Sequence, residues 1–357
     1  MKKIIFVWTY DNNSSFWIYS NNLIENLTKL WVKIYDRRFN LNKWWNFYQI
    51  IMSFLYWIKL QFSYWSKQDI VVYLSTAQLF PPLLSNKNRI FIVHDLFYYD
   101  ERYNRSKLYK FYYSKIHKPI WNRAFKLCSK IVAISNATKN DIIKRFWNNL
   151  NSKIEVIYNW MDLKSFIPAE NKKNNKKYIL YVWSELERKN LKNIIASFWI
   201  LHKKYPELQL LKAPMEKNQV NRNNTINYIK NSWLTEGKDV ILFNEYLSLD
   251  KLVELYQNAE IFCFPSLKEW FWFPIIEAQA CGTPVVTTNY EPMSELVPYK
   301  EMLVDPNNPQ DIADKMIKII EDENLKNNLI KEWLEYVKNF SWGNTAKGFI
   351  KMFEKIN

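Results

Sequence analysis

Two carboxylates stand on either side of a short aromatic loop in the stretch EWFWFPIIEA. Glu269 and Glu277 are separated by seven residues, and Pro274 between them suits the first position of a helix, with Glu277 in the first turn. A helix N-terminus presents free backbone N–H groups and the positive end of the helix dipole, so it can bind anions and hydroxyl groups. Trp270 and Trp272 would fill the space through which such a ligand approaches. The stretch therefore predicts a binding site that its own side chains obstruct.

Polar residues also follow two apolar runs that resemble strands. Arg188 and Lys189 come shortly after YILYV, and His94 comes directly after RIFIV. Ligands of parallel α/β sheets bind at the carboxyl ends of the strands. The alternatives are a solvated basic turn, in a chain with 50 Lys and Arg, and a structural histidine. The positions at strand ends favour the functional interpretation for all three residues.

The balance of glycine and tryptophan is abnormal. The 357 residues include 4 Gly and 17 Trp, whereas average usage of about 7% predicts roughly two dozen glycines. A globular chain needs glycine for positive φ and for close approach to the backbone. A shortage of one residue and a surplus of the other call for a single cause.

Short β-branched runs alternate with helical stretches, which predicts parallel α/β sheets. The runs are KIIFV, DIVVYL, RIFIV, KIVAIS and KIEVIYN, then YILYV, LQLLKA, DVILF, EIFCFPS and TPVVTT. Between the two sets, residues 163–177 are polar and aperiodic, as in a linker. The aromatic, basic segment 42–69 is either a helix lying on a membrane interface or a buried helix pair, and its lack of one clean apolar face favours the second.

The bulk properties limit the class of protein. A formal charge of +15 favours anionic partners, such as a membrane surface, nucleic acid or phosphorylated molecules. The alternative is that the proteins of the source organism are generally rich in lysine. Three scattered cysteines are too few for a disulfide framework or a zinc site, which fits a reducing, cytoplasmic setting. The first residues are typical of a buried strand rather than a signal peptide. The sequence contains no run of about 18 apolar residues, so no membrane span is predicted.

The stretch EWFWFPIIEAQACGTPVV resembles the pattern E-G-F-G-x-P-x-x-E-A-x-A-x-G-x-P-V of the retaining glycosyltransferases of family four. Further stretches resemble that family in the same order along the chain: FWIYSNNLIENL, IVHDLFYYDERY, KIVAISNATKNDIIKRF, KIEVIYNWMDLKSF, YVWSELERKNLKNIIASF and FSWGNTAKGF. The resemblance implies the GT-B fold, in which two Rossmann-like parallel-sheet domains face a cleft. It places an acceptor-side domain at 1–165, a nucleotide-sugar domain at 166–340, and a helix at 341–357 that packs back toward the first domain.

Tryptophan stands in this chain at positions where the family has glycine. These positions are Trp17, Trp160, Trp183, Trp270 and Trp272, with Trp31, Trp147, Trp233 and Trp333 as further candidates. We hypothesise that UGA codons, which the source organism reads as glycine, were translated as tryptophan. Independent changes would each cost roughly 1 kcal/mol or more, and together would rival the ~5–15 kcal/mol stability of a domain. Trp342 matches a family tryptophan, and Trp8, Trp44, Trp45, Trp57, Trp65, Trp121 and Trp199 are left unassigned.

The resemblance also implies roles for individual residues. Arg188 and Lys189 would bind the diphosphate, Glu277 the ribose hydroxyls, and Glu269 the sugar hydroxyls. His94 would lie near the sugar and the acceptor, so it is grouped with Glu269 as catalytic. The remaining donor contacts would come from the backbone at Phe271, Trp272 and Phe273, and from Trp17 and Trp270 read as glycine. No metal or separate cofactor is implied, because backbone and basic residues do this work in the family.

The expected activity is retaining transfer of a sugar to a glycan or lipid-linked acceptor in cell-envelope polysaccharide or glycolipid synthesis. YVWSELERKN is most similar to mannosyltransferase-type members, so GDP-mannose is the leading donor and UDP-sugars remain open. The basic first domain favours a peripheral site at the inner face of an anionic membrane. If the tryptophans are genuine, the alternative is a non-catalytic GT-B scaffold that binds a membrane or a partner. A nucleic-acid binder is disfavoured, because the aromatic residues lie in core-like runs.

Overall fold

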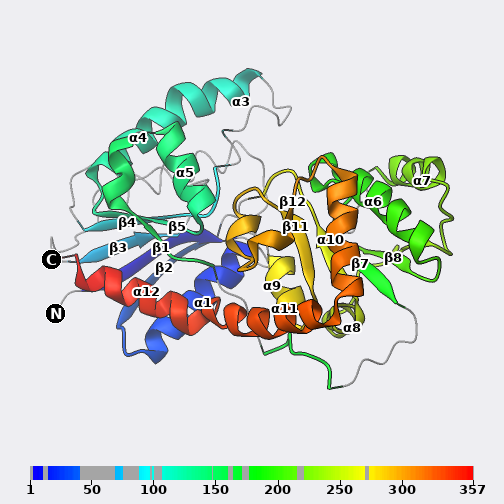
Figure 1. Cartoon of the computed structure of the whole chain (residues 1–357). Helices are drawn as coiled ribbons and strands as arrows, with labels where there is room; N and C mark the ends of the chain where they lie inside the picture. Colours follow the sequence, from blue (N-terminus) through cyan, green and yellow to red (C-terminus); the bar gives the residue numbers. More distant parts are fainter. Residues whose placement is uncertain are drawn as a thin grey trace. The chain divides into compact units, whose positions relative to one another are not determined.

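The computed structural model describes residues 3–10, 15–40, 69–74, 88–96, 99, 107–146, 148–159, 164–170, 177–214, 221–269 and 273–356 (Figure 1). The chain divides into two compact units, one of residues 1–160 with 342–357 and one of residues 161–341. Each unit contains a six-stranded sheet whose strands all run parallel. This confirms the predicted α/β class with two parallel sheets. Residues 42–68 of the aromatic segment lie outside the described part of the chain.

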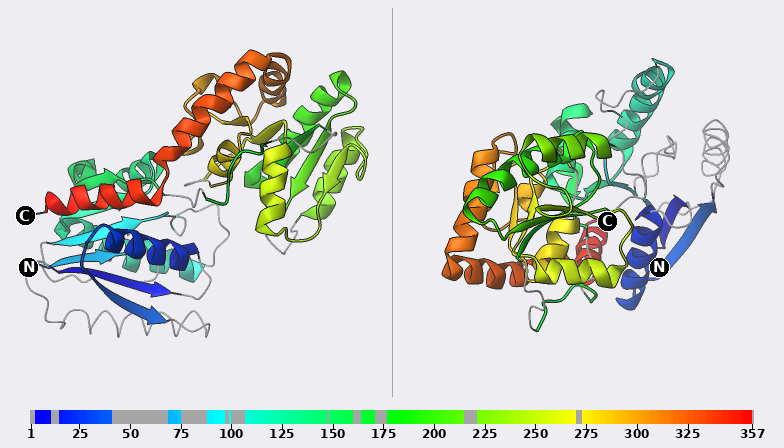
Figure 2. Two further views of the ribbon diagram at one scale, coloured as in Figure 1. Left: turned by 90° about the horizontal axis from the view of Figure 1, so that it is seen from below. Right: turned by 90° about the vertical axis from the view of Figure 1, so that its right-hand side faces the viewer.

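The first unit has the strand order β2-β1-β3-β4-β5-β6. Its strands are β1 (Ile4–Tyr10), β2 (Ile34–Asn40), β3 (Ile70–Tyr73), β4 (Arg89–Val93), β5 (Lys130–Ala133) and β6 (Ile154–Val156). Its helices are α1 (Ser15–Lys29), α3 (Lys107–Phe111), α4 (Lys118–Leu127), α5 (Asn136–Arg145) and α12 (Trp342–Glu354). Helices α4 and α5 lie on one face of the sheet, and α1 packs with α12 on the other (Figures 1 and 2). Strands β3 and β4 are buried along their whole length, as expected for apolar strands covered on both faces.

The second unit has the strand order β12-β11-β10-β7-β8-β9. Its strands are β7 (Tyr178–Val182), β8 (Gln209–Ala213), β9 (Val240–Leu242), β10 (Ile261–Phe264), β11 (Val285–Thr288) and β12 (Leu303–Val304). Its helices are α6 (Leu191–Lys204), α7 (Arg222–Asn231), α8 (Leu249–Asn258), α9 (Phe273–Ala280), α10 (Pro309–Glu321) and α11 (Glu323–Tyr336). The strand order reverses between β7 and β10, and ligands of such sheets bind beside the carboxyl ends at this switch point.

Three helices end in the same hydrogen-bonded turn. After α9, the N–H of Thr283 donates to the Ala278 carbonyl at 2.9 Å, and Gly282 between them has φ of 73°. The turn after α1 pairs Val32 with Leu27 at 3.1 Å, and the turn after α7 pairs Leu234 with Ile229 at 3.2 Å. This six-to-one bond defines the Schellman motif, whose left-handed position is usually glycine.

Tryptophan occupies that left-handed position at two of the three helix ends. Trp31 has φ of 65° and Trp233 has φ of 59°, and their side chains are 96% and 80% exposed. Of the five non-glycine residues with positive φ in the described ranges, three are tryptophan (Trp31, Trp183 and Trp233), and the other two are asparagine. Asparagine tolerates this conformation, whereas a bulky side chain is strained in it. The backbone therefore favours glycine at three positions where tryptophan is written.

Two other tryptophans lie in the hydrophobic core and do not have this signature. Trp121 is buried against Phe91 and Phe125 in the first unit. Trp333 is buried within α11 and does not have a positive φ. The backbone therefore does not call for glycine at Trp333, one of the candidates from the sequence. Trp147 and Trp160 lie outside the described residues.

The two exposed helix ends give a direct stability prediction. We expect Trp31→Gly and Trp233→Gly each to raise the free energy of unfolding by about 1 kcal/mol, because each removes left-handed strain without removing buried contacts. Trp121→Gly is the control and should lower it by more than about 3 kcal/mol through loss of core packing. Urea unfolding of the three variants measures this. Destabilisation by either exposed substitution would contradict the assignment of those positions to glycine.

Candidate functional site

The loops after β7 and β10 meet at the switch point of the second sheet. The two strands pair in parallel, with Ile179 opposite Ile261, so their carboxyl ends lie side by side. The loop after β7 carries Arg188 and Lys189 in a short 3₁₀ turn, and the loop after β10 carries Glu269. The sheet therefore brings Glu269 next to a basic pair that lies 80 and 81 positions earlier in the chain.

These residues form a hydrogen-bonded ion cluster, called here the β7–β10 cluster: Arg188, Lys189, Ser266 and Glu269. The Lys189 ammonium lies 2.6 Å from Glu269 Oε1, and Arg188 Nη1 lies 3.1 Å from each carboxylate oxygen. The hydroxyl of Ser266 donates to Oε1 at 2.7 Å. The side chains of Lys189 and Glu269 are 0% and 3% exposed, and that of Arg188 is 27% exposed. Two cations share one anion, so the cluster has a surplus positive charge for an incoming anion.

Backbone hydrogen bonds hold the two loops together beneath the cluster. The N–H of Leu267 donates to the Arg188 carbonyl at 2.9 Å. Asn190 has φ of 63°, and its side-chain amide donates to the carbonyls of Pro265 at 2.8 Å and Pro306 at 2.6 Å. This buried amide therefore ties the basic turn to two neighbouring loops. Asn190 was not among the predicted site residues, although its position next to the basic pair was a usable signal.

A second buried ion cluster fixes the start of the same loop. The Glu185 carboxylate lies 3.0 Å from Lys212 Nζ and 3.2 Å from Arg222 Nε, and it accepts a hydrogen bond from Thr225 at 3.0 Å. The side chains of Glu185 and Lys212 are 0% and 1% exposed. Because a buried carboxylate is stable only when it is paired, these contacts hold the loop after β7 in one conformation. This cluster was not predicted from the sequence, because its members come from separate elements.

Trp183 stands between β7 and the basic turn. Its φ of 156° is one that L side chains rarely adopt. The indole ring lies against the Lys189 ammonium, with 4.6 Å from Nζ to the ring centre. The Trp183 side chain therefore occupies space beside the cluster that glycine at this position would leave open.

Glu277 lies in α9 and takes no part in the contacts of the β7–β10 cluster. It is the fifth residue of that helix, so the expected placement in the first turn is wrong: α9 runs from Phe273, one residue before Pro274. The carboxyl group accepts a hydrogen bond from the Tyr256 hydroxyl at 2.9 Å. Burial raises the pKa of Glu277 to about 7, from an ordinary value of 4.5. The carboxyl group is therefore largely protonated in mildly acidic solution.

The raised pKa of Glu277 makes stability depend on pH. A carboxyl with a raised folded pKa stabilises the fold while it is protonated, and this contribution is lost as pH rises from 4.5 through 7. We expect Glu277→Gln to become more stable relative to the parent between pH 5 and pH 8, by up to about 3 kcal/mol. Unfolding curves across this range, with the exposed Glu207→Gln as control, measure the difference. Parallel curves for Glu277→Gln and the parent would contradict the prediction.

His94 belongs to the first unit and follows the carboxyl end of β4, as the sequence indicated. Its ring makes an edge-to-face contact with Tyr19 of α1, with centroids 4.5 Å apart. Burial lowers the pKa of His94 to about 4, so the imidazole is neutral at neutral pH. A neutral imidazole offers one nitrogen as donor and one as acceptor.

The remaining predicted site residues are only partly described. Trp17 is in α1, and the structure does not describe its side chain. Phe273 is the first residue of α9, and Trp270, Phe271 and Trp272 lie outside the described residues. In the described ranges, no group of three or more His, Cys, Asp or Glu is placed to hold a metal ion.

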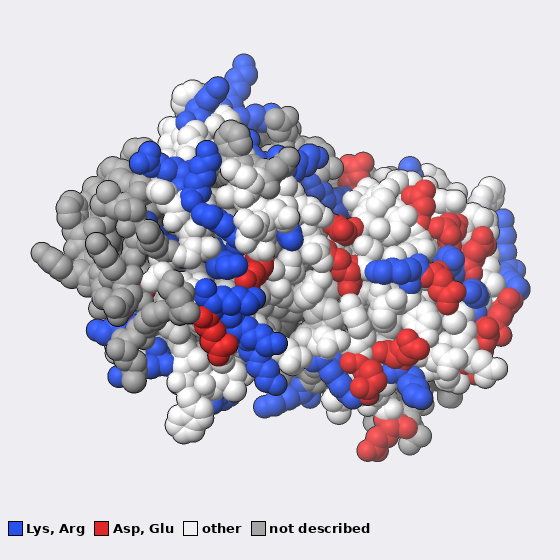
Figure 3. Space-filling view, turned by 60° about the vertical axis from the view of Figure 1, so that its left-hand side comes forward, with Lys and Arg blue, Asp and Glu red and all other residues white. Residues whose placement is uncertain are grey.

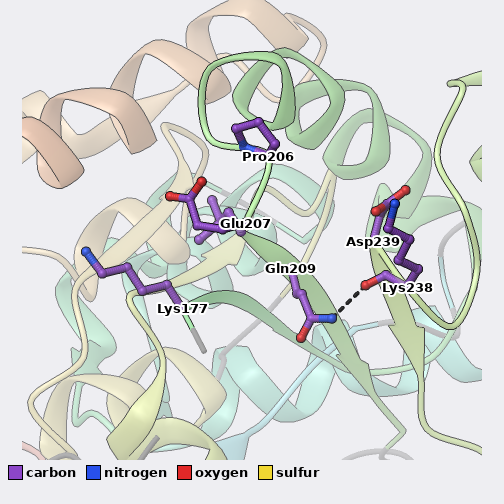
Figure 4. A pocket seen from close by; sticks show the side chains of 7 residues that line it. Lys177, Pro206, Glu207, Gln209, Lys238 and Asp239 are labelled. Carbon is purple, nitrogen blue, oxygen red and sulfur yellow. Dashed lines mark hydrogen bonds between the residues drawn. The ribbon is translucent and has the colours of Figure 1, made fainter. Parts of the chain in front are cut away.

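The second unit also has a hollow of about 410 Å³ (Figure 4). It is lined by Lys177, Pro206, Glu207, Leu208, Gln209, Lys238 and Asp239. These residues stand at or before the first residues of β7, β8 and β9, so the hollow lies at the amino ends of the strands. The β7–β10 cluster, at the carboxyl ends, is therefore the candidate site, and the hollow is not.

Comparison with known proteins matches the chain to glycosyltransferases along most of its length. The model of the family "Glycosyltransferase Family 4" matches residues 18–165, and that of "Glycosyl transferases group 1" matches residues 164–334. An uncharacterised glycosyltransferase of Methanocaldococcus jannaschii is 27% identical over 262 residues, which cover 71% of this chain and 64% of that protein. The O-antigen chain mannosyltransferase RfbU of Salmonella typhimurium is 25% identical over 254 residues, which cover 69% and 66%. The matches thus span slightly less than two thirds of either relative's own length.

A solved structure shares the fold. Sucrose-phosphate synthase from Thermosynechococcus elongatus superposes with a TM-score of 0.71 at 16% identity, over 100% of this chain and 99% of that one. At this level of identity the likeness concerns the fold alone.

Proposed function

This chain belongs to the group 1 and family 4 glycosyltransferases, and from this membership we propose that it transfers a sugar from a nucleotide diphosphate sugar to an acceptor hydroxyl with retention of configuration. The observation that carries the proposal is the β7–β10 cluster, which has surplus positive charge at the switch point of the second sheet. Departure of a nucleoside diphosphate develops negative charge on its phosphate oxygens. Fixed cations in a buried site stabilise such charge far better than water does.

Each residue has a defined part in this proposal. Lys189 and Arg188 bind the diphosphate and stabilise it as it leaves. The Glu269 carboxylate first holds the two cations in place, and its free lone pairs accept hydrogen bonds from the sugar hydroxyls. Glu277, by resemblance, accepts hydrogen bonds from the ribose. His94 belongs to the acceptor side, where its neutral imidazole can exchange hydrogen bonds with sugar hydroxyls. The proposal uses these side chains and backbone N–H groups, with no metal ion or separate cofactor.

The donor in the proposal is GDP-mannose, and a UDP-sugar is the competing donor. The similarity to an O-antigen chain mannosyltransferase supports mannose. The acceptor is a growing glycan or a lipid-linked saccharide of the cell envelope, used at the cytoplasmic face of the membrane. None of the helices in the described ranges is long and apolar enough to span a bilayer.

The proposal includes glycine in the native protein at positions 17, 160, 183, 270 and 272. The positive φ of Trp183 supports one of these directly, and the helix ends at Trp31 and Trp233 support the same decoding elsewhere. The alternative is a non-catalytic GT-B scaffold, and the contact of the Trp183 indole with Lys189 is the observation that favours it. The two functions therefore differ in the chemical identity of a few residues.

Two measurements test the proposed function. The first is mass spectrometry of tryptic peptides from the native protein, namely the peptide that begins at Glu269 and the peptide from Tyr178 to Arg188. The second is calorimetric titration of that protein with GDP-mannose, UDP-glucose, GDP and UDP, followed by a transfer assay with any donor that binds. Glycine in the peptides and binding of one donor are the expected results. Tryptophan in both peptides with no nucleotide binding would leave the scaffold as the function.

A further inference from the structure

The positive charge of the chain is concentrated in the first unit. Residues 1–160 and 342–357 contain 27 Lys and Arg against 10 Asp and Glu, whereas residues 161–341 contain 23 against 25. Figure 3 shows Lys and Arg side chains gathered over the first unit, with few Asp or Glu among them. Nucleotide-sugar binding belongs to the second unit in the proposed function, so the donor does not account for this charge. The excess positive charge of the first unit would attract an anionic partner other than the donor.

The helical stretch from Lys107 to Leu127 is the most one-sided part of that charge. It runs through α3, a π-helical turn (Tyr112–His117) and α4. It contains six Lys or Arg and no Asp or Glu. Its exposed residues are Lys107, Lys110, Phe111, Ser114, Lys115, Ile116, Pro119, Arg123 and Lys126, called here the α3–α4 surface. Lys107, Lys110, Lys115 and Arg123 form no ion pair with any described residue.

Large apolar side chains are exposed among these cations. Phe111 is 57% exposed and Ile116 is 42% exposed, so two large apolar side chains share this surface with the cations. The opposite side of the stretch is anchored: His117, Trp121 and Phe125 are buried in the core of the first unit. The His117 Nδ1 atom lies 2.6 Å from the Tyr99 hydroxyl. The exposed groups therefore stand on a helix that the core holds in place.

We propose that the α3–α4 surface docks on an anionic lipid bilayer, which deepens the proposed function by naming where a lipid-linked acceptor is presented. Lys and Arg are attracted to anionic headgroups, and Phe and Ile insert at the boundary of headgroups and acyl chains. A nucleic acid would satisfy the cations but leaves the two apolar side chains in water. A second copy of this chain would bring like charges together on this surface. The combination of cations with exposed apolar side chains thus favours a bilayer.

Vesicle co-sedimentation of the full chain tests the docking. Vesicles of phosphatidylglycerol with phosphatidylcholine are compared with vesicles of phosphatidylcholine alone. We expect binding only to the anionic vesicles. The triple variant Lys107→Gln, Lys110→Gln, Lys115→Gln should weaken it on the order of 100-fold, because each lysine near an anionic surface contributes to the attraction. The matched control is Lys230→Gln, Lys238→Gln, Lys331→Gln, three exposed lysines of the second unit, and should bind as the parent does.

The apolar contribution has its own variant. Phe111→Ser with Ile116→Ser should reduce binding in high salt, where the electrostatic attraction is screened. Equal binding by parent and lysine variant, or equal binding to neutral and anionic vesicles, would overturn the proposal. Binding of parent to RNA but not to vesicles, or dimerisation lost in the lysine variant, would also overturn it and assign the surface to that other partner. Donor titration without vesicles separates these outcomes from failure of the proposed function, since it does not involve the α3–α4 surface.

Discussion

Lys189→Ala is expected to lower kcat for sugar transfer by about 100- to 1000-fold. Its ammonium is fully buried against Glu269, at the point where the leaving diphosphate is proposed to carry its charge. Removal of one preorganised donor from a developing oxyanion typically has an effect of this size. The measurement is kcat with saturating donor, in chains with glycine at positions 17, 160, 183, 270 and 272. The control is Lys192→Ala, an exposed lysine in the first turn of α6, which should leave kcat unchanged.

Glu269→Gln separates an electrostatic role of the β7–β10 cluster from a purely structural one. The change preserves the shape of the side chain and raises the net charge of the cluster by one. We expect nucleoside diphosphate to bind more tightly and sugar transfer to become slower, because Glu269 is proposed to contact the sugar while opposing the charge of the basic pair. Calorimetric titration with the diphosphate, alongside kcat, reports both. If Lys189→Ala leaves kcat intact, or if Glu269→Gln weakens both diphosphate binding and transfer, the assigned roles are wrong.

The second large effect concerns the tryptophans at positions where glycine is proposed for the native protein. A recombinant chain with the printed sequence is expected to show no detectable transfer, and one with glycine at positions 17, 160, 183, 270 and 272 to be active, a gain of at least about 1000-fold. One reason is that the indole of Trp183 lies against Lys189 and occupies space beside the proposed diphosphate site. The other is that glycine in the loop before α9 lets a ligand approach the backbone N–H groups. Transfer assays of both chains with the same donor measure the gain.

The matched control for this prediction keeps the donor loops unchanged. A chain with glycine only at positions 31 and 233 should be more stable but should remain inactive, because those helix ends lie outside the proposed site. Activity of the printed chain equal to that of the glycine chain would contradict the prediction. It would also show that a glycine backbone at these loops is not required for donor binding.

Much of this architecture is predictable because the buried strands are unbroken apolar runs. All ten of the runs contain strands, including RIFIV and YILYV, which are buried along their whole length. Two strands were not predicted: β2, because IYDRRFN has charged residues at the edge of its sheet, and β12, which has only two residues. An unbroken apolar run indicates a strand that is buried on both faces. An edge strand or a very short strand does not need such a run, so the sequence gives little indication of it.

The candidate site was predictable only in part. Their position at a strand end indicated Arg188 and Lys189 as candidate ligand-binding residues. Their place in one site with Glu269 came from the family resemblance, because the sequence does not show that β7 and β10 are neighbours in the sheet. Glu185 could not be assigned in this way, because its partners Lys212 and Arg222 lie on β8 and α7, and pairing between distant charges leaves no periodic trace. Glu277 was expected one position too early in its helix, because α9 begins at Phe273 and not at the proline that was taken as the first helical residue.

The return of α12 to the first unit has a consequence for synthesis of the chain. Strand β1 and helix α1 are synthesised before the second unit, yet the helix that packs against α1 consists of residues 342–354. The second unit is continuous from 161 to 341 and can therefore fold while translation continues. The first unit must wait with one face of α1 uncovered until residues 342–354 have been synthesised. It is thus begun before the second unit and completed after it.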